Sequence, residues 1–228
     1  MKMIDKMTER LHSLLRLDFD VEFNWQGDYF NQLSDTLYLG ARPSPKHVQT
    51  LKQEGITHIV SCLETKEQPN MLFLKQDFQT LFLPLRDVIN EDIAGGFPTF
   101  FDFAAQAKRV DPKAKLFVHC QVGVSRSATL AIALQMERDR QRFFETFLDV
   151  RAKRLQILPN IGFATQLQRL EHTYHAPSHQ AGRVSSLAQY LHQICNVPVE
   201  LELLQSMLVT HQYDALAAIR AIFGDDIP

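Results

Sequence analysis

The sequence predicts an α/β fold with a mostly parallel sheet and a helical C-terminal extension. Short apolar runs of strand character alternate with helical patterns up to about residue 174, and this alternation favours a parallel sheet. Beyond that point only helical patterns follow. The chain has 228 residues, of which 45% are hydrophobic, which is enough for one core of ordinary size plus an appendage.

Strands are expected where β-branched or large apolar residues cluster between turn signals. The first of them stops at Gly40 and Pro43, and Gly55 has the position of a helix cap. The expected strands are Thr36–Gly40, Ile56–Ser61, Leu81–Leu85 and Lys115–His119. The expected helices are Lys46–Glu54, Phe97–Val110, Arg126–Arg140, Phe143–Arg154 and Ile161–Tyr174.

The chain divides into four predicted parts. Residues 1–22 form an amphipathic helix that we expect to pack on the body of the protein, with a membrane surface or a partner as the alternative. Residues 23–174 form the main domain, residues 175–183 a polar linker, and residues 184–228 a small helical extension. The apolar face of the first helix is made of Met3, Ile4, Met7, Leu11, Leu14 and Leu15. The extension helices are expected at Val184–Ile194, Val199–His211 and Tyr213–Phe223.

The composition excludes several function classes. Lysine and arginine total 24 against 26 acidic residues, so the net charge of −2 gives no reason to expect nucleic-acid binding. The sequence contains no signal-peptide pattern and no run of roughly 18 apolar residues, so we expect a cytoplasmic protein, although export by a non-cleaved signal would leave the same sequence. Three cysteines are too few for a disulfide framework and lack the spacing of zinc ligands, so no metal is expected.

The segment from Val118 to Thr129 carries the predicted chemistry. A strand leads into Cys120, a loop with a glycine follows, and a helix begins at Arg126. The backbone N–H groups of such a loop can point inward at a helix N-terminus and bind a phosphate dianion. Arg126 supplies a planar guanidinium that can hold two phosphate oxygens. The predicted phosphate-binding loop is Gln121, Val122, Gly123, Val124 and Ser125, together with Arg126.

The same positive environment favours a reactive Cys120. A free thiol has a pKa of about 8.5, and cysteines at helix N-termini near cationic groups fall to roughly 3.5–7.5. We therefore expect Cys120 to be a thiolate at the base of an anion site, where it can attack phosphorus. This chemistry needs no metal and no organic cofactor.

The sequence HCxxGxSRS around Cys120 resembles the signature loop of the protein tyrosine phosphatase superfamily, and its SRSAT ending resembles the dual-specificity branch. Further similarities to this family lie at Tyr38–Gly40, Gly55–Val60, Val150–Arg151 and Pro159–Leu167. The resemblance covers residues 23–174 and implies a dual-specificity phosphatase catalytic domain there. It implies the cysteine phosphatase fold, a small twisted sheet flanked by helices, and hydrolysis through a phosphocysteine intermediate.

The resemblance also implies a general acid that precedes the nucleophile by about thirty residues. Asp87 matches this position, because it precedes Cys120 by 33 residues. Asp92 matches a later aspartate of the family and is interpreted as a helix cap, and Glu91 as a solvated charge. We therefore expect Asp87 to protonate the leaving oxygen, a contribution of roughly 10²–10⁴ in rate.

The resemblance gives roles to neighbours of Cys120. It implies that Ser127 assists departure of the thiolate in the second step and that His119 tunes the thiolate pKa. His119 is equally interpreted as a satisfied core histidine. We expect Ser125 to bond the loop backbone and Asn160 to brace a turn.

Most of the other reactive or charged side chains have two interpretations. Cys62 resembles the resolving cysteine of some phosphatases, including the phosphatase-of-regenerating-liver group, and a buried inert thiol is the alternative. Cys195 is expected in the core. A metal site at His172, His175 and His179 is the alternative to a solvated linker, and a basic rim at Arg151, Lys153 and Arg154 is the alternative to a solvated helix face. The extension faintly resembles a ubiquitin-associated module, although apolar periodicity alone explains it.

The expected substrate is a phosphorylated protein. The loop between Cys120 and Arg126 has no basic residue, whereas phosphoinositide phosphatases of the superfamily often place lysines there. Resemblance to the dual-specificity branch implies action on phosphotyrosine and on phosphoserine or phosphothreonine. The first alternative is a phospholipid phosphatase acting on phosphatidylglycerophosphate or phosphoinositide, because Asn24–Trp25 and Tyr38–Pro43 resemble such enzymes and the first helix suits membrane association. The second is a catalytically silent module that binds phosphoproteins. The sequence does not determine the oligomeric state.

Overall fold

The computed structural model describes residues 29–175 and 184–224. The helix predicted over residues 1–22 and the linker residues 176–183 lie outside the described part. Among the described residues, none of the helices combines the length and the apolar character that crossing a bilayer requires.

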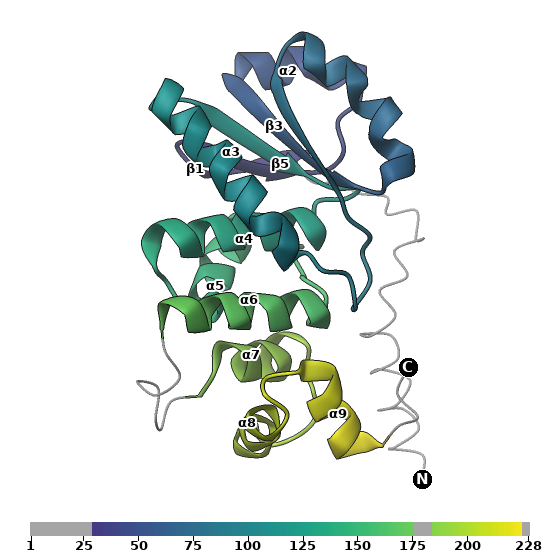
Figure 1. The fold of residues 1–228 in the computed structure, drawn as a ribbon, viewed down its shortest axis with the longest axis vertical. Coiled ribbons are helices and arrows are strands. Elements are labelled where there is room, and N and C mark those ends of the chain that lie inside the picture. The colour runs from purple at the N-terminus through teal and green to yellow at the C-terminus, as the bar shows by residue number, and fades with distance from the viewer. Residues whose placement is uncertain (1–28, 176–183, 225–228) are drawn as a thin grey trace.

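Residues 29–175 contain a five-stranded sheet with strand order β1-β2-β5-β3-β4 (Figure 1). Three neighbouring pairs are parallel, and only β1 pairs antiparallel with β2. The strands are β1 (Phe30–Ser34), β2 (Leu37–Gly40), β3 (Ile56–Leu63), β4 (Gln79–Pro84) and β5 (Lys115–His119). The predicted α/β class with a mostly parallel sheet is confirmed.

Helices cover both faces of this sheet and then continue away from it in layers (Figure 1). The first short helix, α2 (Val48–Gln53), and the 3₁₀ segment η2 (Thr65–Gln76) lie against one face. The other face is covered by α3 (Phe97–Val110) and α4 (Arg126–Asp139), with α5 (Phe143–Lys153) and α6 (Ile161–Tyr174) behind them. The predicted bounds of α3 and α6 agree with the structure to the residue.

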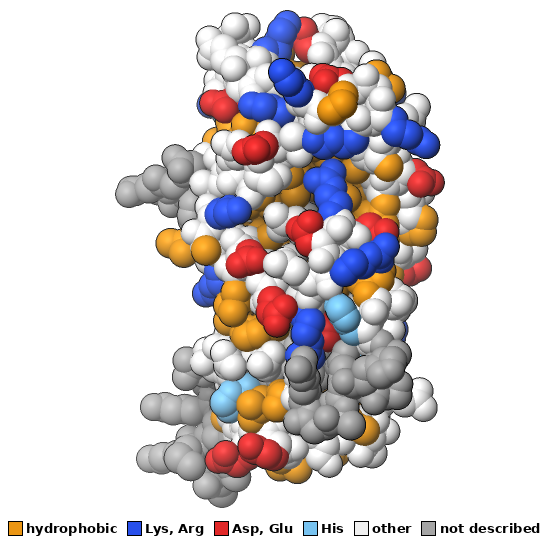
Figure 2. Space-filling model, turned by 90° about the vertical axis from the view of Figure 1, so that its left-hand side faces the viewer, with side chains coloured by type: hydrophobic (Ala, Val, Ile, Leu, Met, Phe, Trp, Pro, Cys, Tyr) orange, Lys and Arg blue, Asp and Glu red, His pale blue; other side chains and the backbone are white. Residues whose placement is uncertain are grey.

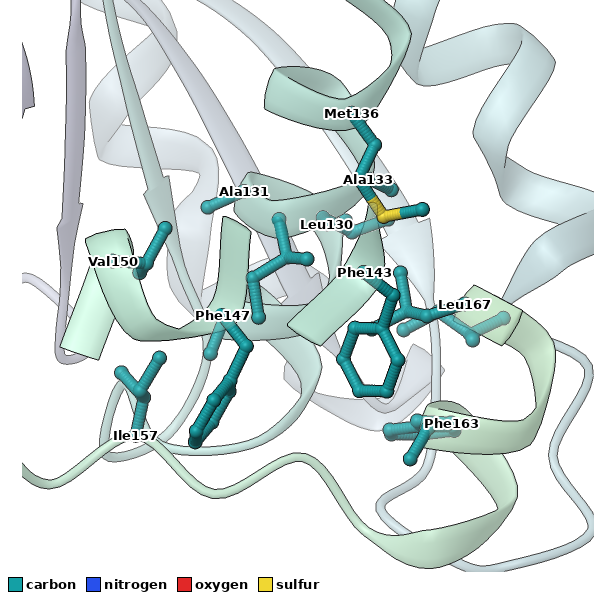
Figure 3. Close-up of a cluster of buried hydrophobic side chains, with 14 of the residues drawn as sticks. Leu130, Ala131, Ala133, Met136, Phe143, Phe147, Val150, Ile157, Phe163 and Leu167 are labelled. Carbon is teal, nitrogen blue, oxygen red and sulfur yellow. The ribbon is translucent and has the colours of Figure 1, made fainter. Parts of the chain in front are cut away.

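The two faces of β5 explain why the core has two parts. Leu116 and Val118 point toward the cluster under α4, and Phe117 points toward the cluster under α2, as the alternation of a strand requires. Helix α4 is buried almost all round, since ten of its fourteen residues are buried. Figure 3 shows side chains of α4, α5 and α6 converging below it. This packing gives the first turn of α4 a rigid support.

Two elements were missed by the sequence patterns. Strand β1 is at the edge of the sheet, and in FNQLS only Leu33 is fully buried, so its apolar signal is weak. The long 3₁₀ segment η2 contains Pro69 and has no helical periodicity. Neither element contributes a side chain to the candidate site, although Asn31 of β1 contacts one of its supports.

The C-terminal helices share one hydrophobic core with residues 29–175. They are α7 (Ser186–Gln189), the π-helical turn η5 (Tyr190–Ile194), α8 (Leu201–Thr210) and α9 (Ala215–Phe223). Leu187, Leu204 and Ala218 belong to the same buried cluster as α4, α5 and α6. A buried ion pair between Arg142 and Glu171 at 3.1 Å lies at this boundary, and Arg142 Nη2 also donates to Val184 O at 3.3 Å. The apolar periodicity of these helices therefore serves packing on α5 and α6.

The surface charge is mixed, as the composition indicates. On the part of the left-hand face that is described, Lys and Arg side chains are interspersed with Asp and Glu side chains (Figure 2). Fields of opposite sign then cancel at short range, so this face offers no broad basic surface for a polyanion.

The direction of the strands decides where the site lies. Parallel β5, β3 and β4 end at the same edge of the sheet, and β2, which is parallel to β5, ends there as well. Cys120 follows β5, Asp87 comes three residues after β4, and Gly40 ends β2. Residues from three distant parts of the sequence are therefore brought together.

Candidate active site

The loop between Cys120 and Arg126 has its carbonyl groups turned outward. Every carbonyl from Gln121 to Ser125 accepts a hydrogen bond from the surrounding structure. The pairs are Arg42 N to Gln121 O at 3.2 Å, Arg154 Nη2 to Val122 O at 3.1 Å, Arg154 Nε to Gly123 O at 2.9 Å, Leu158 N to Val124 O at 2.9 Å, and Thr129 N to Ser125 O at 2.8 Å.

In a trans peptide the carbonyl and the following N–H point in opposite directions. Outward carbonyls at 121–125 therefore turn the N–H groups of residues 122–126 inward, and Gly123 N does donate to Cys120 Sγ at 3.3 Å. No peptide bond among the described residues is cis. The loop has the form of an anion-binding nest at the start of α4.

Gly123 is required by this turn. Its φ is +73°, in the left-handed region that favours glycine. A Cβ there would also come within 2.5 Å of Gly40 O and 2.7 Å of Arg154 Nη2. The glycine of the motif thus permits both the turn and the close approach of β2.

Arg154 is the support of the loop that the sequence patterns missed. We expected it in a basic rim or on a solvated helix face, but its side chain is almost fully buried (2% exposed) and its guanidinium binds two loop carbonyls. It also donates to Asn31 Oδ1 at 2.7 Å. The other members of the expected basic run behave differently: Lys153 donates to Leu33 O, and Arg151 lies over the Phe147 ring. Arg154 differs from Arg151 and Lys153 in lying one residue after the end of α5. The spacing of residues in the sequence does not show where that helix ends.

The Cys120 sulfur lies at the base of the nest. Ser127 Oγ donates to Cys120 Sγ at 3.2 Å. Burial by itself would raise the pKa of Cys120, but the Arg126 guanidinium and the hydrogen bonds from Ser127 outweigh it and hold the pKa below its ordinary value. This geometry favours the thiolate.

His119 lies behind the loop and is uncharged at neutral pH. Burial, with Arg42 and Arg126 nearby, lowers its pKa to about 3. Its Nδ1 lies 3.3 Å from Cys120 O, which can only accept, so Nδ1 carries the proton and Nε2 accepts from Ser61 Oγ at 2.8 Å. His119 therefore contacts the cysteine backbone as a neutral donor.

Arg126 lies beside Asp87. Its Nη1 donates to Leu85 O at 3.2 Å, and its Nε lies 3.4 Å from Asp87 Oδ2. The side chain is only slightly exposed, so its guanidinium is held in place at the mouth of the nest.

The Asp87 carboxylate is anchored through one of its oxygens. Oδ1 accepts from Ser125 Oγ at 2.7 Å and from Asn160 Nδ2 at 3.0 Å. We expected Ser125 to bond the loop backbone and Asn160 to brace a turn. Instead, the Ser125 hydroxyl bonds the carboxylate. Asn160 does brace a turn, since it caps α6 by accepting from Phe163 N at 3.0 Å, and it also holds Asp87.

The segment that carries Asp87, which we call the acid loop (residues 85–94), is fastened to α6. Gln166 does this from both ends of its amide: Nε2 donates to Glu91 O at 2.8 Å, and Oε1 accepts from Ala94 N at 2.8 Å. A Cβ on Gly162 would overlap Ile89 O, so a glycine is needed where the acid loop crosses α6. The sequence patterns placed Gln166 in a family motif but gave it no role.

The other acidic candidates lie outside the nest, and their roles differ from those expected: Asp92 caps a turn rather than a helix, and Glu91, expected as a solvated charge, is only 15% exposed in an ion pair. Asp92 Oδ1 accepts from Gly95 N at 3.0 Å and so caps a short turn. The Glu91 carboxylate pairs with Arg86 at 2.9 Å. Neither side chain contacts the nest in the described structure.

The two remaining cysteines lie away from open solvent. Cys62 and Cys195 are buried free thiols. Burial and the neighbouring Cys120 raise the pKa of Cys62, and burial raises that of Cys195 to about 12. His172 packs against Tyr213, His179 lies outside the described residues, and no group of side chains suited to a metal occurs in the described part of the chain.

We predict that the thiols titrate in two phases, with Cys120 ionising at lower pH than the buried Cys62 and Cys195. The far-ultraviolet absorbance of thiolate should first rise at a pH below the ordinary cysteine pKa, and Cys120→Ser should remove this phase alone. Ser127→Ala should move the phase to higher pH, because the hydroxyl stabilises only the charged sulfur. Ser186→Ala, which removes a buried hydroxyl without a partner in the described structure, should leave it in place. An unmoved phase in Ser127→Ala would contradict this assignment.

Comparisons with known proteins agree with this geometry. The family model for the dual specificity phosphatase catalytic domain matches residues 37–173. A protein-tyrosine-phosphatase of Arabidopsis thaliana, MKP1, is 35% identical over 146 residues, which cover 64% of this chain and 18% of that protein. Mouse dual specificity protein phosphatase 1 is 34% identical over 141 residues, or 62% of this chain and 37% of that protein. The chain thus spans well under half the length of these relatives.

Solved structures give the same result. The human tyrosine phosphatase-like serine/threonine/tyrosine-interacting protein is 31% identical, with a TM-score of 0.60, over 64% of this chain and 98% of that one. PTPMT1 in complex with PI(5)P, at 19% identity and a TM-score of 0.58 over 66% of this chain and 99% of that one, shares the fold. The outward-facing loop, the cysteine at its base and the arginine at its mouth are thus set in the domain of a known family: the chain belongs to the dual specificity phosphatases of the cysteine-based protein tyrosine phosphatase superfamily.

Proposed function

We propose that this protein hydrolyses phosphate monoesters on phosphorylated proteins, on tyrosine and on serine or threonine, through a phosphocysteine intermediate. The observation that carries the proposal is the position of Cys120 Sγ at the base of a nest whose carbonyls all face outward. A phosphate dianion in this nest would meet inward N–H groups, the Arg126 guanidinium and the thiolate together.

In the first step, the Cys120 thiolate attacks phosphorus and the bond to the leaving oxygen breaks. Oδ1 of Asp87 already accepts two hydrogen bonds, so Oδ2 is the oxygen left to carry the proton that the leaving group takes. That oxygen lies 3.4 Å from Arg126 Nε, beside the place where Arg126 would hold the phosphate. The products are a phosphocysteine and a free hydroxyl on the substrate.

In the second step, water attacks phosphorus and the sulfur leaves as thiolate. Asp87, now deprotonated, can accept the proton from the attacking water, since the same group acts in both directions. The Ser127 hydroxyl, 3.2 Å from Cys120 Sγ, stabilises the departing charge. His119 contributes through the Cys120 backbone, because it is neutral.

A phosphoprotein fits the site better than a phospholipid. The loop between Cys120 and Arg126 offers one phosphate site and no basic side chain for a second phosphate. Two Dictyostelium discoideum relatives, 32% and 33% identical, are named MAP kinase phosphatases with leucine-rich repeats. The complex of PTPMT1 with PI(5)P supports only a shared fold. A silent binding module is disfavoured because the thiol, the arginine and the acid are all in place.

We predict that Cys120→Ser abolishes phosphate release from phosphotyrosine, phosphoserine and phosphothreonine peptides, because it removes the thiolate that attacks phosphorus. Asp87→Asn should slow peptide turnover by about 10²–10⁴-fold. It should slow a nitrophenyl phosphate much less, because that leaving group needs little protonation.

Asp92→Asn is the matched control, since it changes a carboxylate of the same loop that caps a turn. It should leave turnover within a few-fold of wild type. Equal losses in the two variants would contradict the assignment of Asp87. Lipid turnover with idle peptides, on a panel that includes phosphatidylglycerophosphate and phosphoinositides, would favour the phospholipid alternative. Silence on the whole panel would favour a binding module.

We also propose that Cys62 protects the nucleophile from irreversible oxidation. Ser61 of β3 lies beside His119 of β5 in the parallel sheet. Cys62 and Cys120 are the next residues on these two neighbouring strands, so the two thiols lie in adjacent parts of the chain. Peroxide would oxidise the Cys120 thiolate to a sulfenic acid, and the Cys62 sulfur would displace water from it to form a disulfide.

The matching experiment is peroxide treatment followed by dithiothreitol. Wild type and Cys195→Ser should recover most of their activity, whereas Cys62→Ser should recover several-fold less, because its sulfenic acid is oxidised further. Mass spectrometry of the treated wild type should show a peptide linking Cys62 to Cys120. Equal recovery in Cys62→Ser and wild type would contradict the proposal.

A further inference from the structure

One buried hydroxyl connects the C-terminal helices to the candidate active site. Tyr190 lies where α7 meets η5, is fully buried, and donates from its hydroxyl to Pro159 O at 2.5 Å. Its ring packs against Phe143 and Phe147 of α5 at centroid distances of 5.4 and 5.0 Å. These contacts with α5 hold the ring in place and direct its hydroxyl toward Pro159 O.

Pro159 belongs to the segment that supports both halves of the site, which we call the brace loop (residues 154–160). Leu158 N, just before it, donates to Val124 O in the nest. Asn160, just after it, donates from its backbone to Ser125 Oγ at 3.3 Å and from its side chain to Asp87 Oδ1 at 3.0 Å. Proline has no N–H, so its carbonyl is the only polar group by which the chain can fasten Pro159.

A purely structural role would need the ring alone. Phenylalanine would fill the same space between Phe143 and Phe147, whereas a buried hydroxyl is costly unless it is bonded. Burial and the adjacent Cys195 hold the pKa of Tyr190 well above its ordinary range, so the hydroxyl is a neutral donor. The hydroxyl adds the bond to Pro159 O and an interaction with the Cys195 thiol, and only the first of these reaches the brace loop.

Further bonds connect the extension to α6, which holds the acid loop through Gln166. Leu187 N donates to Gln168 Oε1 at 2.7 Å, and Ala215 N donates to Thr165 Oγ1 at 3.3 Å. The extension therefore contacts both supports of Asp87, the brace loop and α6.

We propose that Tyr190 is a positioning residue: by holding Pro159, it fixes Asn160 so that Asp87 presents its carboxyl group to the leaving oxygen. The inference rests on the proposed phosphatase activity and extends it beyond residues 37–173, the part that the family model matches. It gives the C-terminal helices a function in catalysis rather than in packing alone.

The test is Tyr190→Phe, which removes one oxygen and keeps the ring. We expect kcat/KM for a phosphotyrosine peptide to fall about tenfold, since small displacements of catalytic groups cost up to about 10²-fold. For nitrophenyl phosphate the loss should be less than about twofold, because that leaving group needs little help from an acid. Tyr38→Phe is the matched control, as Tyr38 is also buried and its hydroxyl is bonded to Lys115 Nζ at 3.1 Å, away from the brace loop.

Three outcomes would overturn the inference. The first is a Tyr190→Phe variant that is folded, as judged by its urea denaturation curve, and keeps the wild-type kcat/KM on both substrates. The second is an equal loss of activity on both substrates, which would indicate damage to the nest rather than to the position of Asp87. In an Asp87→Asn background, Tyr190→Phe should change the ratio no further, so an undiminished effect there would also contradict it. Absence of turnover in the wild type would instead refute the proposed function itself, so the two failures are distinguishable.

Discussion

The structure depends on one constraint, the outward orientation of five consecutive carbonyl groups in the loop after β5. Each N–H that faces the candidate phosphate site does so because the carbonyl before it is held by a donor outside the loop. The donors come from Arg42, which lies just after β2, from α4 and from the brace loop, so the sheet edge and the helices must be in place before the nest exists. The thiolate at its base follows from the same arrangement, since the positive environment of Arg126 and the Ser127 hydroxyl outweighs the cost of burying a charge.

The general acid is positioned by a second set of contacts, which shares members with the first. Ser125 belongs to the nest and also bonds Asp87, and Asn160 bonds both Ser125 and Asp87. Distances between nucleophile, phosphate and acid are thereby coupled, which suits a reaction in which attack and protonation occur together. The C-terminal helices extend this support by a further layer. They bury their apolar faces against α5 and α6 and so stabilise the two elements from which the brace loop begins and ends.

Local patterns predicted much of the fold and the chemical core of the site. The strand, loop and helix around Cys120 could be read from spacing, whereas the role of Asp87 was implied by the family resemblance. The supports could not be predicted this way. Arg154 looks like one more basic residue at a helix end. Ser125, Gln166 and Tyr190 gain their roles from partners 31 to 75 residues away, which no local sequence period reports. Strand β1 was missed because an edge strand with one buried residue has little apolar signal.

The claim that the nest depends on its outward carbonyls is tested most directly by oxyanion affinity. Tungstate, an anion of phosphate shape, would be titrated calorimetrically into Cys120→Ser with and without Arg154→Lys, and with Arg151→Lys as the control from the same helix end. Lysine keeps the charge but cannot hold two carbonyls at fixed angles as the Arg154 guanidinium does. The account predicts at least about tenfold weaker binding for Arg154→Lys and unchanged binding for Arg151→Lys. Unchanged affinity in a folded Arg154→Lys protein would show that the nest forms without this anchor and would contradict the account.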